Sequence, residues 1–495
     1  MNQHAWALGV LPRLQQKLTS DNPVAGSNFG LSTAITPNGL RAVVGCTGGK
    51  YVAVFDRIES GWTQVATLQV SESDDTRQGW RVSISEDGNT VVSAAPFALS
   101  YEGALYVFQN VSGVWQNTGT LREATHGVTS QLCIQGLGLS LDGTTVACTR
   151  ETVDADIGGV AVFVRTGATT WLQQGALIMP PTVNTQHALE GRGISFAHNG
   201  SIMAFGAPSD NGNNGTVFVY KRDSSLNWNP LTSMKVTSTV NFGSFVVMSA
   251  DASTIIAGNN LGTIYVFTFN GSGGYVQVQQ LTNSDASNVF GDAAALSASG
   301  QRLIVGDRIQ NKVTTPTTYA YGGAFIYDRL PNGFVRVNGI VDAIDNTTQG
   351  TEDLSYFGAY GVGVSDENHF IIGAFGDNSR TGSFNSSSVF ECSRLTLRLG
   401  RCGIRLRGST SYFHSYSCPF LLDIVSHSEL QHKTRWIDSD DVHVDDVGSS
   451  TLDLTTGFKG NDQRSFRILI FNYVSSFLAL APTMVLESFL PFDDC

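Results

Sequence analysis

The segment from Phe242 to Phe267 decides the fold, because it holds one complete copy of a repeated pattern. It is FGSFVVMSADASTIIAG over residues 242–258 and continues as IYVF over residues 264–267. A Phe-Gly pair opens the copy, a tight turn follows at Ala252, and two apolar runs come after it. Apolar residues alternate before the turn, which indicates a β-strand with one buried face. The segment therefore predicts antiparallel strands joined by short turns.

The same pattern recurs along most of the chain, from Phe29 to Phe390. A fixed-period β repeat is typical of propellers and related repeat architectures. The second position of the Phe-Gly pair falls in turn at Gly30, Gly79, Ile134, Gly191, Gly243, Gly291 and Gly358. The complete pair is present as Phe29-Gly30, Phe242-Gly243, Phe290-Gly291 and Phe357-Gly358.

The turns and the strands after them define the repeating unit. Pairs such as Asn38-Gly39 and Asp87-Gly88 tolerate the positive φ angles of a two-residue hairpin connection. A third strand follows a glycine, and a fourth carries an aromatic residue and then an aliphatic residue on the same face, as in Trp62 and Leu68. Each repeat therefore predicts one four-stranded antiparallel sheet.

The strand count predicts how the array closes. The first three strand types occur seven times, but the fourth has only six good copies, and the missing one lies upstream at residues 11–18. Closure by this segment would leave only short, protected edges. We therefore predict an all-β fold, a seven-bladed β-propeller over residues 11–393 closed by an N-terminal strand, with an extension at residues 1–10 and a non-repeat tail of uncertain structure at residues 394–495.

The repeat resembles the FG-GAP repeat, the unit of the integrin α-subunit propeller and of many bacterial and protist surface proteins. Gly206-Ala207-Pro208 matches the second half of that name, and Ala94-Ala95-Pro96 comes close. The resemblance covers residues 11–393 and implies a recognition or cell-adhesion scaffold that is secreted or lies at the cell surface. The N-terminus shows no basic region and only a short apolar run, so no signal peptide is expected there and the compartment stays open.

The composition narrows the classes of partner that the chain is expected to bind. The chain has a net charge of −12, 15% charged residues and 53 glycines, which suits an all-β protein with many turns. No basic stripe is present, so nucleic acid is not an expected partner.

The seven cysteines leave an odd number for pairing. Cys133 and Cys148 flank one hairpin, but a two-residue turn would pair Leu141 with Thr144 and leave the cysteines out of register. We expect buried free thiols at these positions, with a disulfide as the less favoured alternative.

Loop lengths indicate which face binds. The long connections are those between second and third strands and between fourth and first strands, and both sets leave an up-and-down blade on the same side, which we call the long-loop face. Binding residues often lie on variable loops held by a rigid scaffold. We predict a protein or glycan ligand there, contacted by acidic residues; ordinary solvated loop composition is the alternative. The candidates are Asp74, Asp75, Asp154, Asp156, Asp210, Asp307 and Asp377.

No cofactor is expected. The resemblance implies calcium loops of the form D-x-D-x-D-G-x-x-D in the first hairpin, but each such hairpin here is a two-residue turn, too short to supply six or more oxygen ligands. The family's metal site is therefore not carried over. Calcium in other loops, at residues 154–156 or 210–214, is the alternative.

Catalytic motifs are also missing from the sequence. We find no nucleophile elbow, phosphate-binding glycine loop or H-E-x-x-H helix. We therefore expect a non-enzymatic recognition scaffold. The alternatives are a hydrolase or lyase that uses the central channel, and a structural surface protein.

The tail differs in character from the repeats. Its acidic run at residues 438–446 matches no structural zinc spacing, so we expect solvated charge there. Residues 468–486 carry no charge and are long enough to span a bilayer, although polar residues dilute the run. A small appended domain or loose tail, a membrane anchor, and read-through beyond the true end of the gene stay open as interpretations.

Overall fold

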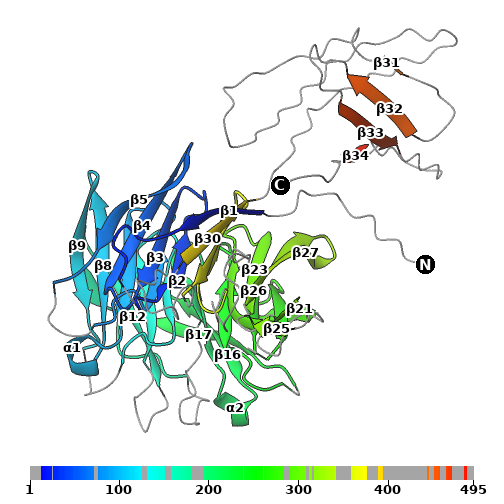
Figure 1. The fold of residues 1–495 in the computed structure, drawn as a ribbon. Coiled ribbons are helices and arrows are strands. Elements are labelled where there is room, and N and C mark those ends of the chain that lie inside the picture. The colour runs from blue at the N-terminus through cyan, green and yellow to red at the C-terminus, as the bar shows by residue number, and fades with distance from the viewer. Residues whose placement is uncertain are drawn as a thin grey trace, which may run out of the picture. The chain divides into compact units, whose positions relative to one another are not determined.

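The structure is a computed structural model, and it describes the chain with gaps. The described residues are 13–24, 26–71, 76–124, 131–150, 158–180, 193–237, 239–259, 261–282, 290–307, 311–314, 317–320, 322–341, 358–375, 388–393, 443–444, 451–456, 464–470 and 484–487. The chain divides into two units, one of residues 11–394 and one of residues 1–10 with residues 395–495. Figure 1 shows the first unit as a β-propeller, with sheets arranged around a common centre.

Six blades each use one continuous stretch of chain, and each is a four-stranded antiparallel sheet. The first three are blade 1 with β2 (Phe29–Ile35), β3 (Arg41–Cys46), β4 (Tyr51–Ile58) and β5 (Gly61–Leu68); blade 2 with β6 (Arg81–Ile84), β7 (Thr90–Ala95), β8 (Ala104–Val111) and β9 (Val114–Leu121); and blade 3 with β10 (Leu137–Leu139), β11 (Thr145–Arg150), β12 (Gly159–Arg165) and β13 (Trp171–Gln173).

The next three blades follow the same plan. They are blade 4 with β14 (Ile194–Phe196), β15 (Ile202–Ala207), β16 (Thr216–Arg222) and β17 (Trp228–Met234); blade 5 with β18 (Phe245–Met248), β19 (Thr254–Gly258), β20 (Thr263–Phe269) and β21 (Tyr275–Thr282); and blade 6 with β22 (Phe290–Leu296), β23 (Arg302–Asp307), β26 (Gly323–Leu330) and β27 (Gly333–Val341). Blade 6 also carries a hairpin, β24 (Asn311–Thr314) with β25 (Thr317–Ala320).

A further four-stranded sheet, which we call the closing sheet, joins the two ends of this unit. Its order is β1-β30-β29-β28, with β1 (Arg13–Leu18), β28 (Val362–Val364), β29 (His369–Ala374) and β30 (Ser388–Ser393). Leu18 lies opposite Val389 in the antiparallel pair of β1 with β30. The structure thus shows six contiguous blades, not the seven predicted, together with this composite sheet.

Strand β1 also makes the contact that an outer strand makes with the next blade. The Gln16 side chain binds both backbone groups of Trp62, as donor to its O at 3.0 Å and as acceptor from its N at 2.8 Å. In blade 5, Gln279 binds Phe334 of blade 6 in the same two-bond manner, at 2.8 and 2.7 Å. The N-terminal strand therefore occupies the outer-strand position of its sheet.

Glycines allow neighbouring blades to approach backbone to backbone. A Cβ atom on Gly206 of blade 4 would clash with the carbonyl oxygen of Gly243 in blade 5. A Cβ on Gly373 of the closing sheet would clash in the same way with Gly30 of blade 1. At these two boundaries, one of which joins the two chain ends, the glycine of the Phe-Gly pair thus meets the glycine that is next to last in the second strand.

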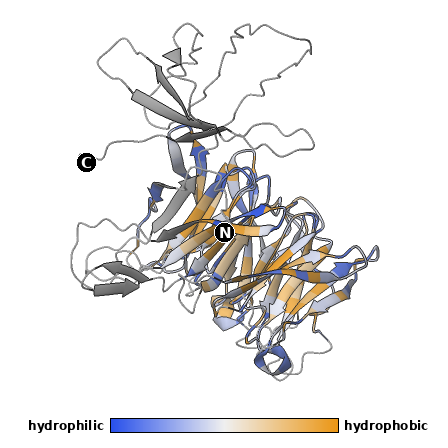
Figure 2. Cartoon of the chain, turned by 90° about the vertical axis from the view of Figure 1, so that its right-hand side faces the viewer, coloured by the Kyte–Doolittle hydropathy of each residue, from blue (hydrophilic) through white to orange (hydrophobic). Residues whose placement is uncertain are grey.

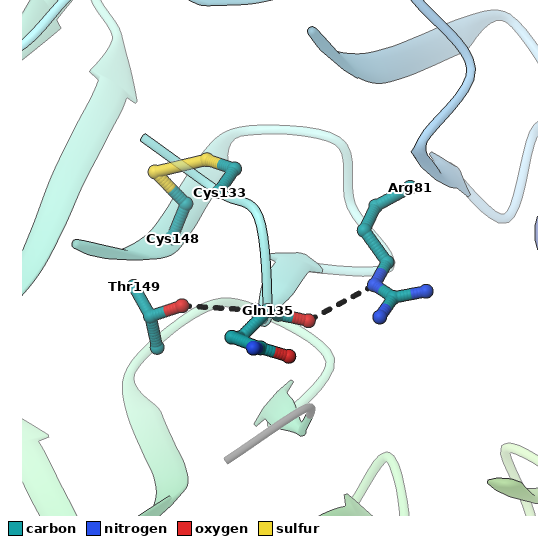
Figure 3. The surroundings of a disulfide bond; sticks show 6 residues. Arg81, Cys133, Gln135, Cys148 and Thr149 are labelled. Atoms are coloured by element: carbon teal, nitrogen blue, oxygen red, sulfur yellow. Dashed lines mark hydrogen bonds between the residues drawn. A yellow bond between two sulfur atoms is a disulfide. The ribbon is translucent and has the colours of Figure 1, made fainter. Parts of the chain in front are cut away.

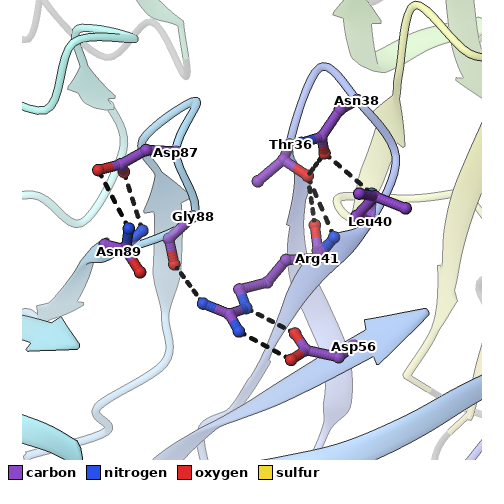
Figure 4. Close-up of polar contacts among 8 residues, drawn as sticks. All are labelled: Thr36, Asn38, Leu40, Arg41, Asp56, Asp87, Gly88 and Asn89. Carbon is purple, nitrogen blue, oxygen red and sulfur yellow. Dashed lines mark hydrogen bonds and ion pairs between the residues drawn. The ribbon is translucent and has the colours of Figure 1, made fainter. Parts of the chain in front are cut away.

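The face opposite the long loops, which we call the short-turn face, carries hydrogen bonds between turns of neighbouring blades (Figure 4). Arg41 donates from Nη1 to the Gly88 carbonyl at 3.0 Å, and from Nε and Nη2 to the Asp56 carboxylate. Backbone bonds continue the series from blade 2 to blade 6 and from the closing sheet to blade 1, and between blade 6 and the closing sheet Ser299 N donates to Asp366 Oδ1 at 3.0 Å. The backbone bonds are Glu86 N to Leu141 O, Asp142 N to His198 O, His198 N to Ala250 O, Ala250 N to Ala298 O, and Asp366 N to Pro37 O.

The core lies between adjacent sheets. Phe29, Phe242 and Phe290 are almost fully buried, and Phe29 packs in one apolar cluster with Leu18 and with Ile371 of the closing sheet. Figure 2 shows apolar residues along the described strands. The predicted repeat positions Phe357 and Gly191 lie outside the described residues.

The described strands of the tail form one antiparallel sheet, β31 (His443–Val444), β32 (Thr451–Thr456), β33 (Arg464–Ile470) and β34 (Met484–Glu487). The two ends of the uncharged run 468–486 lie in β33 and β34, where Ile468 pairs with Leu486. In the part of the chain that the structure describes, no helix has the length and apolar character to cross a bilayer.

Candidate recognition site

The acidic residues expected at the ligand site do not come together in the described structure. Asp74, Asp75, Asp154, Asp156 and Asp377 lie outside the described residues. Asp210 is 1% exposed and accepts a 2.6 Å hydrogen bond from the Thr216 hydroxyl, so its carboxylate holds a turn. Asp307 ends β23 and is fully buried. Neither of these two carboxylates is presented to solvent.

Aromatic side chains gather instead on the long-loop face of blade 2. The ring centroids of Trp80 and Phe97 are 5.8 Å apart, and those of Phe97 and Tyr101 are 5.4 Å apart, both in edge-to-face geometry. Trp80 and Phe97 are partly exposed, and Tyr101 is 51% exposed. Aromatic clusters that stay open to solvent are characteristic of binding surfaces.

Arg77 joins this cluster, and Arg81, which follows Trp80 in the chain, approaches a ring beside the closing sheet. The Arg77 guanidinium carbon lies 4.7 Å from the Phe97 ring centroid, and that of Arg81 lies 6.0 Å from the Tyr360 ring centroid. Tyr360 stacks on Phe375 with centroids 5.7 Å apart. We call the whole set the aromatic–arginine patch. Its members are Arg77, Trp80, Arg81, Phe97, Tyr101, Tyr360 and Phe375.

The turn that carries Tyr101 is held in an unusual backbone conformation. Leu99 and Ser100 both have φ of 57°, and Tyr101 has φ of 74°. The equivalent turn of blade 4 has the same conformation, but Asn211, Gly212 and Asn213 occupy it. Left-handed backbone costs about 1–2 kcal/mol per non-glycine residue. Figure 1 shows the two turns, labelled α1 (Ala98–Tyr101) and α2 (Asp210–Asn213), at the same edge of the propeller.

A disulfide between Cys133 and Cys148 overturns the expectation of free thiols, with the two Cα atoms 5.0 Å apart. The reason is that the hairpin ladder does not reach Cys133. Pairing starts at Leu137, opposite Cys148, and before it the chain turns back so that Cys133 N donates to Thr149 O at 2.9 Å. The cysteines are therefore neighbours through a loop rather than across a ladder (Figure 3).

The segment next to this disulfide, residues 131–136, forms hydrogen bonds with residues of the patch. Gln131 N and Leu132 N donate to the Tyr101 and Glu102 carbonyls. Ile134 O accepts from the Trp80 indole at 2.7 Å. Gln135 O accepts from the Arg81 Nε–H at 2.9 Å, as Figure 3 shows. The disulfide thus anchors the segment that orients three members of the patch.

Side chains from sheets that are not direct neighbours also meet at two places. Arg81 of blade 2 reaches Tyr360 of the closing sheet on the long-loop side. At the short-turn side, His198 Nε2 of blade 4 lies 2.9 Å from Glu86 Oε1 of blade 2. In each case one blade lies between the two sheets that the contact joins.

Among the described residues, no group of three or more His, Cys, Asp or Glu is placed to hold a metal ion. Burial raises the pKa of Tyr275 and of Tyr327 to about 12, and it raises the pKa of the Cys46 thiol. Tyr275 and Tyr327 lie in strands of blades 5 and 6, and Cys46 is the last residue of β3 in blade 1.

The patch was not predicted from the sequence, because the candidate ligand-binding residues were chosen among acidic side chains. Trp80 and Arg81 directly follow the Gly79 repeat position, and Phe97 and Tyr101 lie in a long second-to-third connection. Aromatic residues at loop positions, where the repeat needs none, were the signal that could have marked it.

Comparison with known proteins supports the fold and leaves the family open. No family model matches the chain, and no curated protein matches it. Among solved structures, 1032 chains match, so the fold is common and does not by itself narrow the function. One match is the β-propeller domain of Cps50 (Swd1) from Myceliophteria thermophila, with 11% sequence identity and a TM-score of 0.50, over 77% of this chain and 99% of that one. At this identity the likeness concerns the fold alone.

Proposed function

We propose that this protein is a non-enzymatic recognition scaffold that binds a protein or glycan ligand through its long-loop face. The observation that carries the proposal is the aromatic–arginine patch, where Tyr101 is 51% exposed on a strained turn. Strain of this kind persists at functional positions because the surrounding structure compensates for it. Blade 4 holds the same turn with residues that fit it better, so the fold does not require Leu-Ser-Tyr in blade 2.

The proposal also covers the number of blades and the type of the repeat. The closing sheet serves as a seventh blade, and the repeat is of the FG-GAP type. Three contacts support the part of the proposal that concerns the closing sheet: β1 pairs with β30, Gln16 binds Trp62 as Gln279 binds Phe334, and Gly373 abuts Gly30. A closed ring would hold the long loops on a rigid base.

The test is a binding screen of the full chain against a glycan array and a random peptide display library. A Phe97→Ser/Tyr101→Ser variant removes two rings of the patch, and a Leu226→Ser variant removes an apolar side chain of similar exposure from a third-to-fourth turn. We expect specific ligands for the wild type and the Leu226 variant, and none for the patch variant. Ligands that bind all three proteins equally, or turnover of substrates in a hydrolase panel, would refute the proposal.

A further inference from the structure

Six triplets of the form Asn-x-Ser/Thr occur in the sequence, and this is the form that N-linked glycosylation requires. A triplet is used where its asparagine is accessible and the chain passes through the compartment in which oligosaccharide is attached. Such triplets also arise by chance, so the structure has to select among them. They begin at Asn110, Asn199, Asn214, Asn270, Asn346 and Asn385, and the first four lie among the described residues.

The Cys133–Cys148 disulfide bears on the compartment. Disulfides form and persist in oxidising environments, such as the endoplasmic reticulum, the extracellular space and the bacterial periplasm, and they are rare in the cytosol. Both cysteines are fully buried, so this bond belongs to the interior of the folded chain. A chain that forms it while folding is therefore expected in a compartment of the kind where N-glycans are attached.

Asn270 opens the turn between β20 and β21 of blade 5, and Asn270, Gly271 and Ser272 are all exposed. The Asn270 Oδ1 accepts hydrogen bonds from Ser272 N at 2.9 Å, from the Ser272 hydroxyl at 3.0 Å and from Gly274 N at 3.1 Å. Its Nδ2 donates no hydrogen bond among the described residues. A Cβ atom on Gly271 would meet no described atom within 4 Å beyond its chain neighbours, so the space around the turn is open.

The turn does not need this amide nitrogen. The equivalent turn of blade 4 begins with Asp223, whose Oδ1 accepts from Ser225 N at 2.9 Å and from Asn227 N at 2.8 Å. The same backbone bond closes both turns, from Asn270 N to Gly274 O and from Asp223 N to Asn227 O. A carboxylate therefore serves the turn as an amide does, and the Nδ2 of Asn270 is left available for modification.

The other described triplets are less suited to carry a glycan. The Nδ2 of Asn214 donates to a backbone carbonyl of its own turn at 2.8 Å, so modification would break that bond. Asn110 is half-buried, and its Oδ1 is enclosed by protein. Asn199 is exposed, but a Cβ atom on the adjacent Gly200 would clash with Thr145 of blade 3, so this turn lies close against its neighbour.

We propose that Asn270 is an N-glycosylation site. In the transfer, Nδ2 loses a proton to a base and forms a bond to the anomeric carbon of the sugar. The bond from that carbon to the diphosphate of a lipid-linked oligosaccharide donor breaks, and the lipid diphosphate leaves. The turn between the third and fourth strands lies on the short-turn face, so this glycan leaves the aromatic–arginine patch uncovered. The inference does not depend on the recognition function proposed above.

The first test is glycopeptide mass spectrometry of the protein purified from its natural source. We expect the peptide that contains Asn270 to carry a glycan, and the peptide that contains Asn214 to be unmodified. A bare Asn270 in this material would overturn the proposal. A glycan on Asn214 in place of Asn270 would overturn it as well, because the hydrogen bonds of the two turns would then not select the acceptor.

Variants of the full chain, secreted from a eukaryotic host, separate the glycan from the turn. Asn270→Asp keeps the acceptor oxygen, as Asp223 does in blade 4, and should lose the glycan while thermal denaturation shows a folded protein. Ser272→Ala keeps Asn270 but removes the hydroxyl of the triplet, and should lose the same glycan. Asn214→Asp is the matched control and should leave the glycan mass unchanged. A glycan mass that neither Asn270→Asp nor Ser272→Ala reduces would contradict the assignment.

Discussion

At the residue scale, four of the sheets share a backbone contact that only glycine permits. Gly45, Gly206, Gly306 and Gly373 are each next to last in a second strand, and a Cβ on any of them would clash with the carbonyl of the glycine at the Phe-Gly position of the next sheet. This contact explains why both halves of the motif recur together. The blades pack where the backbones touch, and the Phe side chains fill the space beside them.

Gly206→Ala tests this contact. The added methyl has no room against the Gly243 carbonyl, so blades 4 and 5 must separate, and we expect the free energy of unfolding to fall by about 1–3 kcal/mol. Gly119→Ala is the control, because a Cβ there meets other atoms only at ordinary contact distance, 3.6 Å or more. Denaturant titration measures both variants. Equal stability of the two would contradict the account.

The first turn of blade 2 gives a pH-dependent prediction. Burial works to raise the pKa of Asp87, but hydrogen bonds from the Ser85 hydroxyl and from Asn89 outweigh it and leave that pKa below the usual range. The stability from these bonds is present above the unfolded pKa of about 3.9 and is lost as pH falls through the lower folded pKa.

Ser85→Ala should therefore raise the pKa of Asp87, as followed by NMR titration of its carboxyl carbon. Ser83→Ala removes a hydroxyl from the same strand, β6, away from the turn, and should leave that pKa where it is. An Asp87 titration that Ser85→Ala does not move would refute the role given to the hydroxyl.

At the element scale, the disulfide and the loop beside it position residues of the aromatic–arginine patch. The sequence had instead indicated the acidic loops as the candidate site. The Cys133–Cys148 bond joins the start of blade 3 to β11, and residues 131–135 hold Trp80, Arg81 and the Tyr101 turn through hydrogen bonds. Preorganisation of this kind lowers the entropy that a ligand must overcome on binding.

A Cys133→Ala/Cys148→Ala variant tests that role. The bond closes a loop of 15 residues, so its loss should lower the free energy of unfolding by about 3 kcal/mol. Amide exchange at Gln131 and Leu132 should accelerate, because their N–H bonds to the Tyr101 turn are no longer anchored. Cys46→Ala removes a buried free thiol elsewhere and should leave exchange at both amides unchanged. Unaltered amide exchange in the double variant would show that the loop keeps its hydrogen bonds without the disulfide.

At the scale of the whole molecule, the sequence predicted the architecture better than the site. Alternating apolar residues and Asn-Gly or Asp-Gly turns are local signals, so the four-stranded sheets and the role of Leu18 could be predicted from them. The disulfide could not, because the register argument assumed that the ladder continued to Cys133. The patch joins Arg81 of blade 2 to Tyr360 of the closing sheet, and no local pattern places such distant residues together.

Closure by β1 is the physical claim on which the rigid long-loop face depends. Leu18 is 2% exposed, and burying a leucine side chain of this kind contributes about 1.5–3 kcal/mol. The Gln16 bonds to Trp62 and the pairing with β30 add to it. Loss of the strand should therefore expose the core beside Phe29 and Ile371.

The most direct measurement is thermal denaturation of a chain that starts at Ser20 and is otherwise complete, compared with one that starts at Leu11. We predict that the chain starting at Leu11 keeps the Tm of the full protein, that the chain starting at Ser20 melts at a clearly lower temperature, and that a synthetic peptide of residues 11–19 raises its Tm again. Equal Tm values for the two chains, with no effect of the peptide, would contradict ring closure.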